Sequence, residues 1–280
     1  MFHVPRFNPA RVHLALQRGL TYGLALLLSI WVLLPIVVIA VAGLSTRQAI
    51  YAWPKALSPE TFSLETLTFF LNAHGVLSAT WNSIAVALLT LVLSLVIGAP
   101  AGYALARFIF PGRDAFKVLI LTTRAFPVVI LSIPLAVTFI QWGLYDTLFA
   151  VALVHTALAL PFTILITSSI FVAVPRDLEE AAQTLGCDRL QAFVRVVLPI
   201  ALPGLAAAAI FTFVISWNEV FAATILTLRQ RTLPAHVLTV LNESPLPFRF
   251  AGGLFMIMPA LVFIFFIRRY LFNLWGITTK

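Results

Sequence analysis

The chain has 280 residues, of which 61% are hydrophobic and 10% are charged. An average soluble domain is about 25% charged, so the composition excludes a soluble globular protein. The net charge of +8 does not indicate nucleic-acid binding, because the sequence contains no compact basic domain that would do the binding.

Six apolar runs are each long enough to cross a membrane as a helix, for which roughly 20 residues are needed. The runs cover about 20–43, 81–106, 117–141, 147–173, 203–228 and 252–275. Because no segment shows the alternating polarity of barrel strands, the sequence predicts an all-α membrane protein, a six-transmembrane-helix bundle. We expect residues 1–19 to form an N-terminal segment and residues 20–280 to form one transmembrane domain.

The first run is interpreted as a retained transmembrane helix. It is longer than the apolar region of a signal peptide, and no small-x-small cleavage site clearly follows it. The longest segment outside the runs, about 45–80, contains Ser58-Pro59-Glu60, which is a good helix start. From there, residues 61–71 are predicted to form an interfacial helix with Phe69 and Phe70 on its apolar side.

A polar segment, 174–202, separates the fourth and fifth runs and is predicted to form two short helices with a break. Pro175 suits a helix start, and acidic residues follow it where the helix dipole is positive: Asp177, Glu179 and Glu180. Gly186 can take the left-handed conformation that closes a helix. Asp188 can cap the second helix, and Pro199 is expected to end or kink it.

The basic residues set the orientation of the predicted bundle. With the N-terminus inside, the inner segments hold most of the 18 lysines and arginines: Arg6, Arg11, Arg18, Arg107, Arg113, Lys117, Arg176, Arg189, Arg195, Arg268, Arg269 and Lys280. The outer segments hold Arg47, Lys55, Arg229, Arg231 and Arg249. Because cytoplasmic segments carry the excess of Lys and Arg, both termini and the 174–202 segment are predicted to be cytoplasmic.

Two ionisable residues fall within the predicted spans, Arg124 in the third and Glu219 near the middle of the fifth. A charge there costs at least about 2.5 kcal/mol on insertion scales, so it normally faces protein or water. One interpretation places Asn218 and Glu219 along a translocation path. The other makes Glu219 a structural partner, for example of a buried cation such as Arg124. His155 and Gln141 are weaker polar candidates.

The polar segment also carries a composite motif. Glu180-Ala181-Ala182 is followed by Gly186 and, after nine further residues, by Val196-x-Leu198-Pro199. This motif resembles the EAA signature of permease subunits of bacterial ABC importers, which implies their type I permease fold. In that family the segment is a cytoplasmic coupling helix that docks on an ATPase subunit. The resemblance implies this role for Glu179, Glu180, Ala181, Ala182, Gly186, Leu198 and Pro199.

The segment Ala101–Phe108 and the turn Phe110-Pro111-Gly112-Arg113 are similar to the carbohydrate branch of these permeases, of which the maltose importers are the best-known members. The resemblance covers roughly residues 80–275. It implies a bacterial inner or plasma membrane, a sugar or polyol as solute, and a complex with a second homologous permease, two ATPase subunits and an extracytoplasmic binding protein. The end of the chain departs from the family, because only Gly276 and Lys280 echo its basic tail.

The same resemblance suggests two further groups of site residues. The translocation-path candidates are Trp217, Asn218, Glu219 and Arg124. The segment 229–251 is expected to contact the binding protein, through Arg229, Arg231, Pro245, Pro247 and Arg249.

The sequence lacks the motifs of an ATPase and of common enzyme classes. The chain lacks Gly-x-x-x-x-Gly-Lys-Ser/Thr, so ATP and Mg²⁺ are expected on partner subunits and no cofactor on this chain. Catalytic motifs are absent, and the single cysteine, Cys187, supports neither a disulfide nor a cysteine metal site. Two alternatives stay open: a secondary transporter driven by an ion gradient, for which Glu219 is the only acidic candidate, and an ABC permease for a non-sugar solute.

Overall fold

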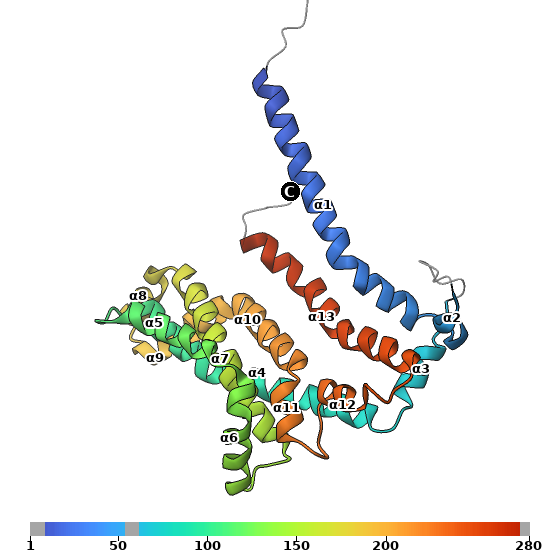
Figure 1. Cartoon of the computed structure of the whole chain (residues 1–280). Helices are drawn as coiled ribbons and strands as arrows, with labels where there is room; N and C mark the ends of the chain where they lie inside the picture. The colour runs from blue at the N-terminus through green and yellow to red at the C-terminus, as the bar shows by residue number, and fades with distance from the viewer. Residues whose placement is uncertain (1–8, 54–61, 275–280) are drawn as a thin grey trace, which may run out of the picture. The chain divides into compact units, whose positions relative to one another are not determined.

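The computed structural model describes residues 9–53 and 62–274, and every regular element in them is a helix (Figure 1). The elements in chain order are α1 (Pro9–Gly43), α2 (Arg47–Tyr51), α3 (Glu65–Leu71), α4 (Val76–Arg107), α5 (Arg113–Thr122), η1 (Thr123–Ala125), α6 (Val128–Gln141), α7 (Leu148–Ala173), α8 (Arg176–Thr184), α9 (Arg189–Ala192), η2 (Phe193–Val197), α10 (Leu198–Asn218), α11 (Phe221–Leu226), α12 (Leu233–Val240) and α13 (Leu246–Leu274). The chain divides into two compact units, one of residues up to 70 with 245–254 and one of 71–244 with 255 onward.

The first unit contains the long apolar helix α1. Its side chains are exposed along most of its length, with Trp31 at 76% exposure, as expected for a helix that faces lipid. The local core of the unit is aromatic, since the rings of Phe70 and Phe248 lie 4.9 Å apart, centroid to centroid. Arg47 pairs with Glu65 at 2.8 Å and links the starts of α2 and α3.

The second unit is built around α4, α7 and α10, which pack against one another. Small residues let α4 and α7 approach closely, because a Cβ added at Gly98 would lie 2.8 Å from Thr163 Cγ2. The Thr167 hydroxyl donates to the Gly98 carbonyl at 3.0 Å across the same contact. Close backbones joined by Ser and Thr hydrogen bonds are typical of helices packed inside a bilayer.

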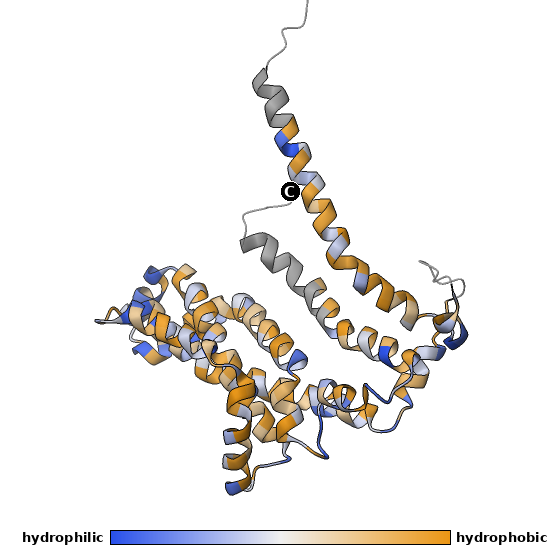
Figure 2. Ribbon diagram, viewed as in Figure 1, coloured by the Kyte–Doolittle hydropathy of each residue, from blue (hydrophilic) through white to orange (hydrophobic). Residues whose placement is uncertain are grey.

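Four helices of the described chain are long and apolar enough to cross a membrane: Leu16–Gly43, Val76–Arg107, Leu148–Ala173 and Arg189–Asn218. A fifth candidate is the pair formed by Arg113–Ala125 and Val128–Gln141, and a shorter apolar helix covers Leu246–Pro259. Figure 2 shows apolar residues running along α4, α7 and α10, and hydrophilic residues gathered at α8 and α9. The prediction of an all-helical membrane protein is therefore confirmed.

The span predicted over 117–141 is broken in the structure. The helix Arg113–Ala125 and the helix Val128–Gln141 meet at 83°. Phe126 is extended, with ψ 116°, as expected of a residue before proline, and Pro127 is the N-cap of α6.

The span predicted over 203–228 also differs from the structure. Helix α10 begins at Leu198 and ends at Asn218, so Glu219 directly follows the end of this helix and does not lie in its middle. Helix α11 follows after Val220. The predicted spans 81–106 and 147–173 agree closely with α4 and α7.

The segments between the spans are partly helical. The interfacial helix predicted from Thr61 begins at Glu65, and its predicted start, 58–60, lies outside the described residues. The 229–251 segment, expected to contact the binding protein, contains α12 and the start of α13. Helix α1 begins at Pro9, within the predicted N-terminal segment 1–19, and the tail residues Gly276 and Lys280 lie outside the described residues.

Candidate functional site

The 174–202 segment forms the two helices that the sequence predicts, with the break at Gly186. Helix α8 has Asp177 and Glu179 in its first turn. Gly186 has φ +94°. Its N–H donates to the Gln183 carbonyl at 3.0 Å, and the N–H of Cys187 donates to the Ala182 carbonyl at 3.1 Å. These two bonds form a Schellman motif, which satisfies the last carbonyls of the helix.

The second helix begins with a capping box. The Asp188 carboxylate accepts from the Gln191 N–H at 2.7 Å, and the Gln191 side chain accepts from the Asp188 N–H at 3.4 Å. Of the two outcomes expected at Pro199, an end or a kink, the end is wrong, because α9, η2 and α10 run on as one helix from Arg189 to Asn218. In η2 the N–H of Leu198 bonds to the Phe193 carbonyl, and this wider turn precedes the proline ring.

The residues of the composite motif divide by exposure. Glu180, Ala181 and Gly186 are exposed, as is Pro199, whereas Ala182 is buried and Leu198 is half-buried. Two apolar side chains that the sequence analysis did not select are highly exposed beside them, Leu185 at 87% and Leu190 at 70%. The turn between α8 and α9 thus presents an apolar and acidic surface suited to contact another protein.

Glu179, in contrast, faces the inside of the protein. Its side chain is 11% exposed and its Oε2 accepts from Arg107 Nε at 2.9 Å. Tyr103 donates to the other carboxylate oxygen, and Arg107 Nη2 donates to the Val174 carbonyl at 3.0 Å. Sequence reasoning missed Tyr103 and Arg107 as site residues, although their i, i+4 spacing at the end of a predicted span places both on one helix face.

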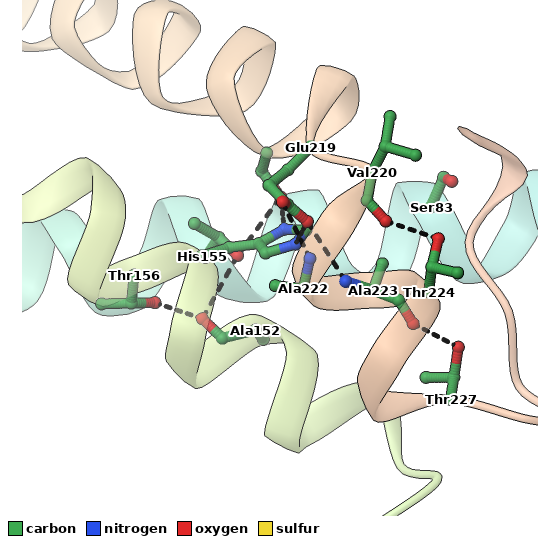
Figure 3. Close-up of polar contacts among 12 residues, drawn as sticks. Ser83, Ala152, His155, Thr156, Glu219, Val220, Ala222, Ala223, Thr224 and Thr227 are labelled. Carbon is green, nitrogen blue, oxygen red and sulfur yellow. Dashed lines mark hydrogen bonds and ion pairs between the residues drawn. The ribbon is translucent and has the colours of Figure 1, made fainter. Parts of the chain in front are cut away.

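A second polar cluster lies at the break between α10 and α11 (Figure 3). His155 of α7 points at Glu219, and its Nε2 lies 2.9 Å from Glu219 Oε2. The Glu219 carboxylate also accepts from the N–H groups of Ala222 at 2.9 Å and Ala223 at 3.2 Å. It therefore caps α11 while it binds α7. His155 is fully buried, and its Nδ1 lies 2.8 Å from Ser216 Oγ.

The pairing of Glu219 with Arg124 is contradicted. Arg124 is exposed in η1, donates to the Leu158 carbonyl at 2.5 Å, and lies over the Phe162 ring at 4.4 Å. The side-chain partner of Glu219 is instead His155, which the sequence marked only as a weaker candidate.

The remaining path candidates differ in exposure. Trp217 is buried, donates to the Met256 carbonyl at 3.1 Å and stacks on Phe213. Asn218 is exposed, and its amide donates to the Val214 carbonyl at 2.9 Å.

The candidate binding-protein residues belong to both units. In the second unit, Asp146 Oδ1 accepts from the N–H groups of Leu228, Arg229 and Gln230 at 2.8, 3.0 and 3.1 Å. Burial alone would raise the pKa of Asp146. The three hydrogen bonds and the Arg229 charge together lower it by more than burial raises it, so the pKa lies below its ordinary value. Arg231 donates to Thr239 Oγ1 at 2.6 Å.

In the first unit, Pro245 accepts from the N–H groups of Phe248 and Arg249 at 3.0 and 3.3 Å. Pro247 lies in the first turn of α13, where a proline has no helical N–H bond to lose. Among the described residues no group of three His, Cys, Asp or Glu side chains is arranged to hold a metal ion.

Comparisons with known proteins agree with this geometry. A family model described as "Binding-protein-dependent transport system inner membrane component" matches residues 94–274. The trehalose transport system permease protein SugB of Mycobacterium tuberculosis is 32% identical over 257 residues, covering 89% of this chain and 90% of that protein. The diacetylchitobiose uptake permease NgcG of Streptomyces coelicolor is 33% identical over 72% of this chain and 66% of that protein.

Among solved structures, a chain of a bacterial ABC transporter involved in the import of alginate has the same fold. It matches with a TM-score of 0.72 at 21% identity, and the match covers 95% of this chain and 99% of that chain. The resemblance read from the composite motif is thus confirmed. This chain belongs to the family of binding-protein-dependent transport system inner membrane components, which are permease subunits of ABC importers.

Proposed function

We propose that the chain forms half of the translocation pathway of an ATP-driven importer for a sugar or sugar-like solute. The observation that carries this proposal is the α8–Gly186–α9 turn, which exposes Glu180, Leu185 and Leu190. The turn is held by the Schellman motif at the end of α8 and by the capping box at the start of α9. A short amphipathic helix that ends in such a turn suits docking in a groove of a partner protein. We assign the ATPase subunit as that partner.

We further propose six spans with both termini in the cytoplasm. The four long helices and the bent α5–α6 pair account for five, and α13, with 29 residues, is long enough to be the sixth. An even number of spans returns the chain to the side on which it began. The excess of Lys and Arg in the segments assigned to the inside supports cytoplasmic termini. The membrane that we assign is a bacterial cell membrane.

The proposed complex contains a second homologous permease, two ATPase subunits that bind ATP and Mg²⁺, and one extracytoplasmic binding protein. One coupling turn per permease serves one ATPase, so two ATPases require two permeases. A transporter with the same fold as this chain has been solved in complex with a periplasmic protein that holds an alginate pentasaccharide. We assign Arg229, Arg231, Pro245, Pro247 and Arg249 to the contact with the binding protein.

The solute class is inferred from the relatives. Their names include permeases for trehalose, diacetylchitobiose and arabinooligosaccharides. A further relative takes up osmoprotective compounds, which keeps a non-sugar solute in consideration. Along the pathway, the exposed side chains of Asn218 and Arg124 are better placed to meet a solute than the buried Trp217. The Glu219 carboxylate already has three hydrogen-bond partners in this chain.

The proposal is tested by uptake into proteoliposomes that contain the complete complex and its binding protein. Labelled trehalose, diacetylchitobiose and arabinooligosaccharides serve as probes, with Mg·ATP inside the vesicles. We expect uptake of at least one probe with ATP and none with a proton or sodium gradient alone. Uptake that follows an ion gradient without ATP would support the secondary-transporter alternative and refute the proposal.

A further inference from the structure

Helix α8 contacts α4 through its side chains, and Glu179 makes the buried contacts. At the start of the helix the exposed Arg176 donates from Nη2 to the Arg107 carbonyl at 3.4 Å. The buried residues of α8 are Glu179 and Ala182. Ala182 offers only a methyl group, whereas Glu179 makes an ion pair and a hydrogen bond to α4. Most other side chains of this nine-residue helix, including Asp177, Leu178 and Glu180, are exposed.

Arg107 forms hydrogen bonds both to helix α8 and to the residue that follows α7. Its Nε donates to Glu179 at 2.9 Å and its Nη2 donates to the carbonyl of Val174 at 3.0 Å. Val174 ends α7 just before α8 begins. The planar guanidinium presents several donors in a fixed geometry. It therefore fixes the position of Glu179 in α8 relative to the Val174 carbonyl at the end of α7.

The site joins four elements. Tyr103 donates to Glu179 from α4, and its ring lies 5.7 Å from that of Phe171 on α7 and 4.4 Å from that of Phe193 in η2, centroid to centroid. Phe171 is fully buried. Rigid, packed side chains of this kind shift as a group when one of them is moved.

The charges are buried but favourably oriented. The side chains of Arg107 and Glu179 are only 8% and 11% exposed, so solvent and salt screen them little. Arg107 lies in the last turn of α4 and Glu179 in the first turn of α8, and each therefore meets the helix dipole of opposite sign. A buried pair adds little stability over apolar residues, but it specifies one arrangement, and losing one partner is costly.

We propose that Arg107 and Glu179, with Tyr103, form an internal tether that transmits movement of the docked helix α8 to α4. Glu179 is then a positioning residue bound within this chain and not an ATPase contact, and Arg107 is required for coupling although it touches no nucleotide or solute. This inference rests on the proposed docking of α8 on the ATPase.

The test measures ATP hydrolysis by the complete complex in lipid nanodiscs, with Mg·ATP, in the presence and absence of its cognate binding protein. The stimulation by the binding protein reports coupling, and copurified ATPase subunits report assembly. Arg107→Gln and Glu179→Gln are each expected to reduce the stimulation about 2- to 30-fold, the range of measured coupling effects. Asp114→Asn, an exposed first-turn carboxylate of α5 and not of the docked helix, is the control and should leave it unchanged.

A double variant separates transmission from folding. Arg107→Gln with Glu179→Gln removes both charges, so no buried charge is left without a partner, and the complex should assemble yet couple poorly. Wild-type stimulation in the assembled double-glutamine variant would overturn the tether.

The wild-type complex distinguishes failure of the tether from failure of the proposed function. If the wild-type complex hydrolyses ATP but shows no stimulation by the binding protein, the proposed function fails and the tether fails with it. If the wild-type complex is stimulated and the Arg107 and Glu179 variants match it, the tether alone is refuted.

Discussion

The Glu219 side chain supplies hydrogen-bond acceptors at a position where the backbone is not helical. Helix α10 stops at Asn218, and the carboxylate then takes the place of backbone carbonyls by accepting the first N–H groups of α11. An ionised carboxylate only accepts, so His155 Nε2 donates in the bond that the two side chains share, and Nδ1 lies within hydrogen-bond distance of Ser216 Oγ in α10. The break therefore depends on both α7 and α10.

We predict that Glu219→Gln lowers the free energy of unfolding by about 1.5–3 kcal/mol, as for loss of hydrogen bonds to a charged group. Unfolding in a titration with SDS, followed by tryptophan fluorescence, measures the effect. Double variants identify the partner: Glu219→Gln should be strongly non-additive with His155→Gln and additive with Arg124→Gln within about 0.5 kcal/mol. Additivity with His155→Gln would show that the contact contributes nothing.

Gly186 carries a backbone constraint in the coupling turn. Its φ of +94° disfavours a side chain, although a Cβ would meet nothing within 4 Å. We predict that Gly186→Val costs about 1–2 kcal/mol of stability and also abolishes stimulation of ATP hydrolysis by the binding protein. Gly143, with φ +70° and equally open surroundings, is the matched control. Gly143→Val should cost similar stability and retain stimulation, and equal loss in both variants would remove Gly186 from the coupling residues.

At the scale of elements, Asp146 ties the α6–α7 connection to the α11–α12 connection. Asp146 has φ +59°, a conformation that Asp and Asn tolerate better than most residues. Its carboxylate gathers three consecutive backbone N–H groups that would otherwise lack partners. The tie fixes the start of the segment that carries Arg229 and Arg231.

The lowered pKa of Asp146 predicts the sign of a pH effect. Because the folded pKa lies below the unfolded one, the carboxylate stabilises the fold above the unfolded pKa, and this contribution disappears as the pH falls through the folded pKa. Proteolysis of the 227–232 connection should therefore accelerate below about pH 4, the ordinary range of Asp. Asp146→Asn keeps the backbone preference and should show fast cleavage at every pH. The same acid response in Asp146→Asn would refute the assignment.

The elements also show which features the sequence can predict. The Gly186 break and the Asp188 cap were predicted correctly because both depend on residues within four positions. The break at Glu219 was missed, and one of the contacts that hold it joins Glu219 to His155, which is 64 positions away. The Arg107–Glu179 pair joins residues 72 positions apart and had no local signal beyond the end of a span.

At the scale of the whole molecule, the exposed surface is too apolar for water. Side chains of α1, α4 and α6 such as Trp31, Val96 and Ile133 are more than half exposed. Lipid can cover such side chains, and so can the second permease that we propose. The composition and the family thus agree on a multi-pass membrane protein. One labelling experiment can then determine which side of the membrane each connecting segment faces.

Cys187 is the only cysteine of the sequence and is partly exposed next to Gly186, so it reports the side on which the coupling turn lies. We predict that a membrane-impermeant maleimide labels Cys187 in inverted vesicles and leaves it unlabelled in right-side-out vesicles, because the excess of Lys and Arg predicts a cytoplasmic location for this turn. Docked ATPase should reduce the labelling, since the neighbouring Leu185 and Leu190 would then be covered. The control is Cys187→Ser with Leu228→Cys: Leu228 is 61% exposed in the segment assigned to the outside, and its labelling should show the opposite pattern. Labelling of both positions from the same side would contradict the six-span topology, whereas reversal of both patterns would keep the spans and invert the protein, which would exclude docking on a cytoplasmic ATPase.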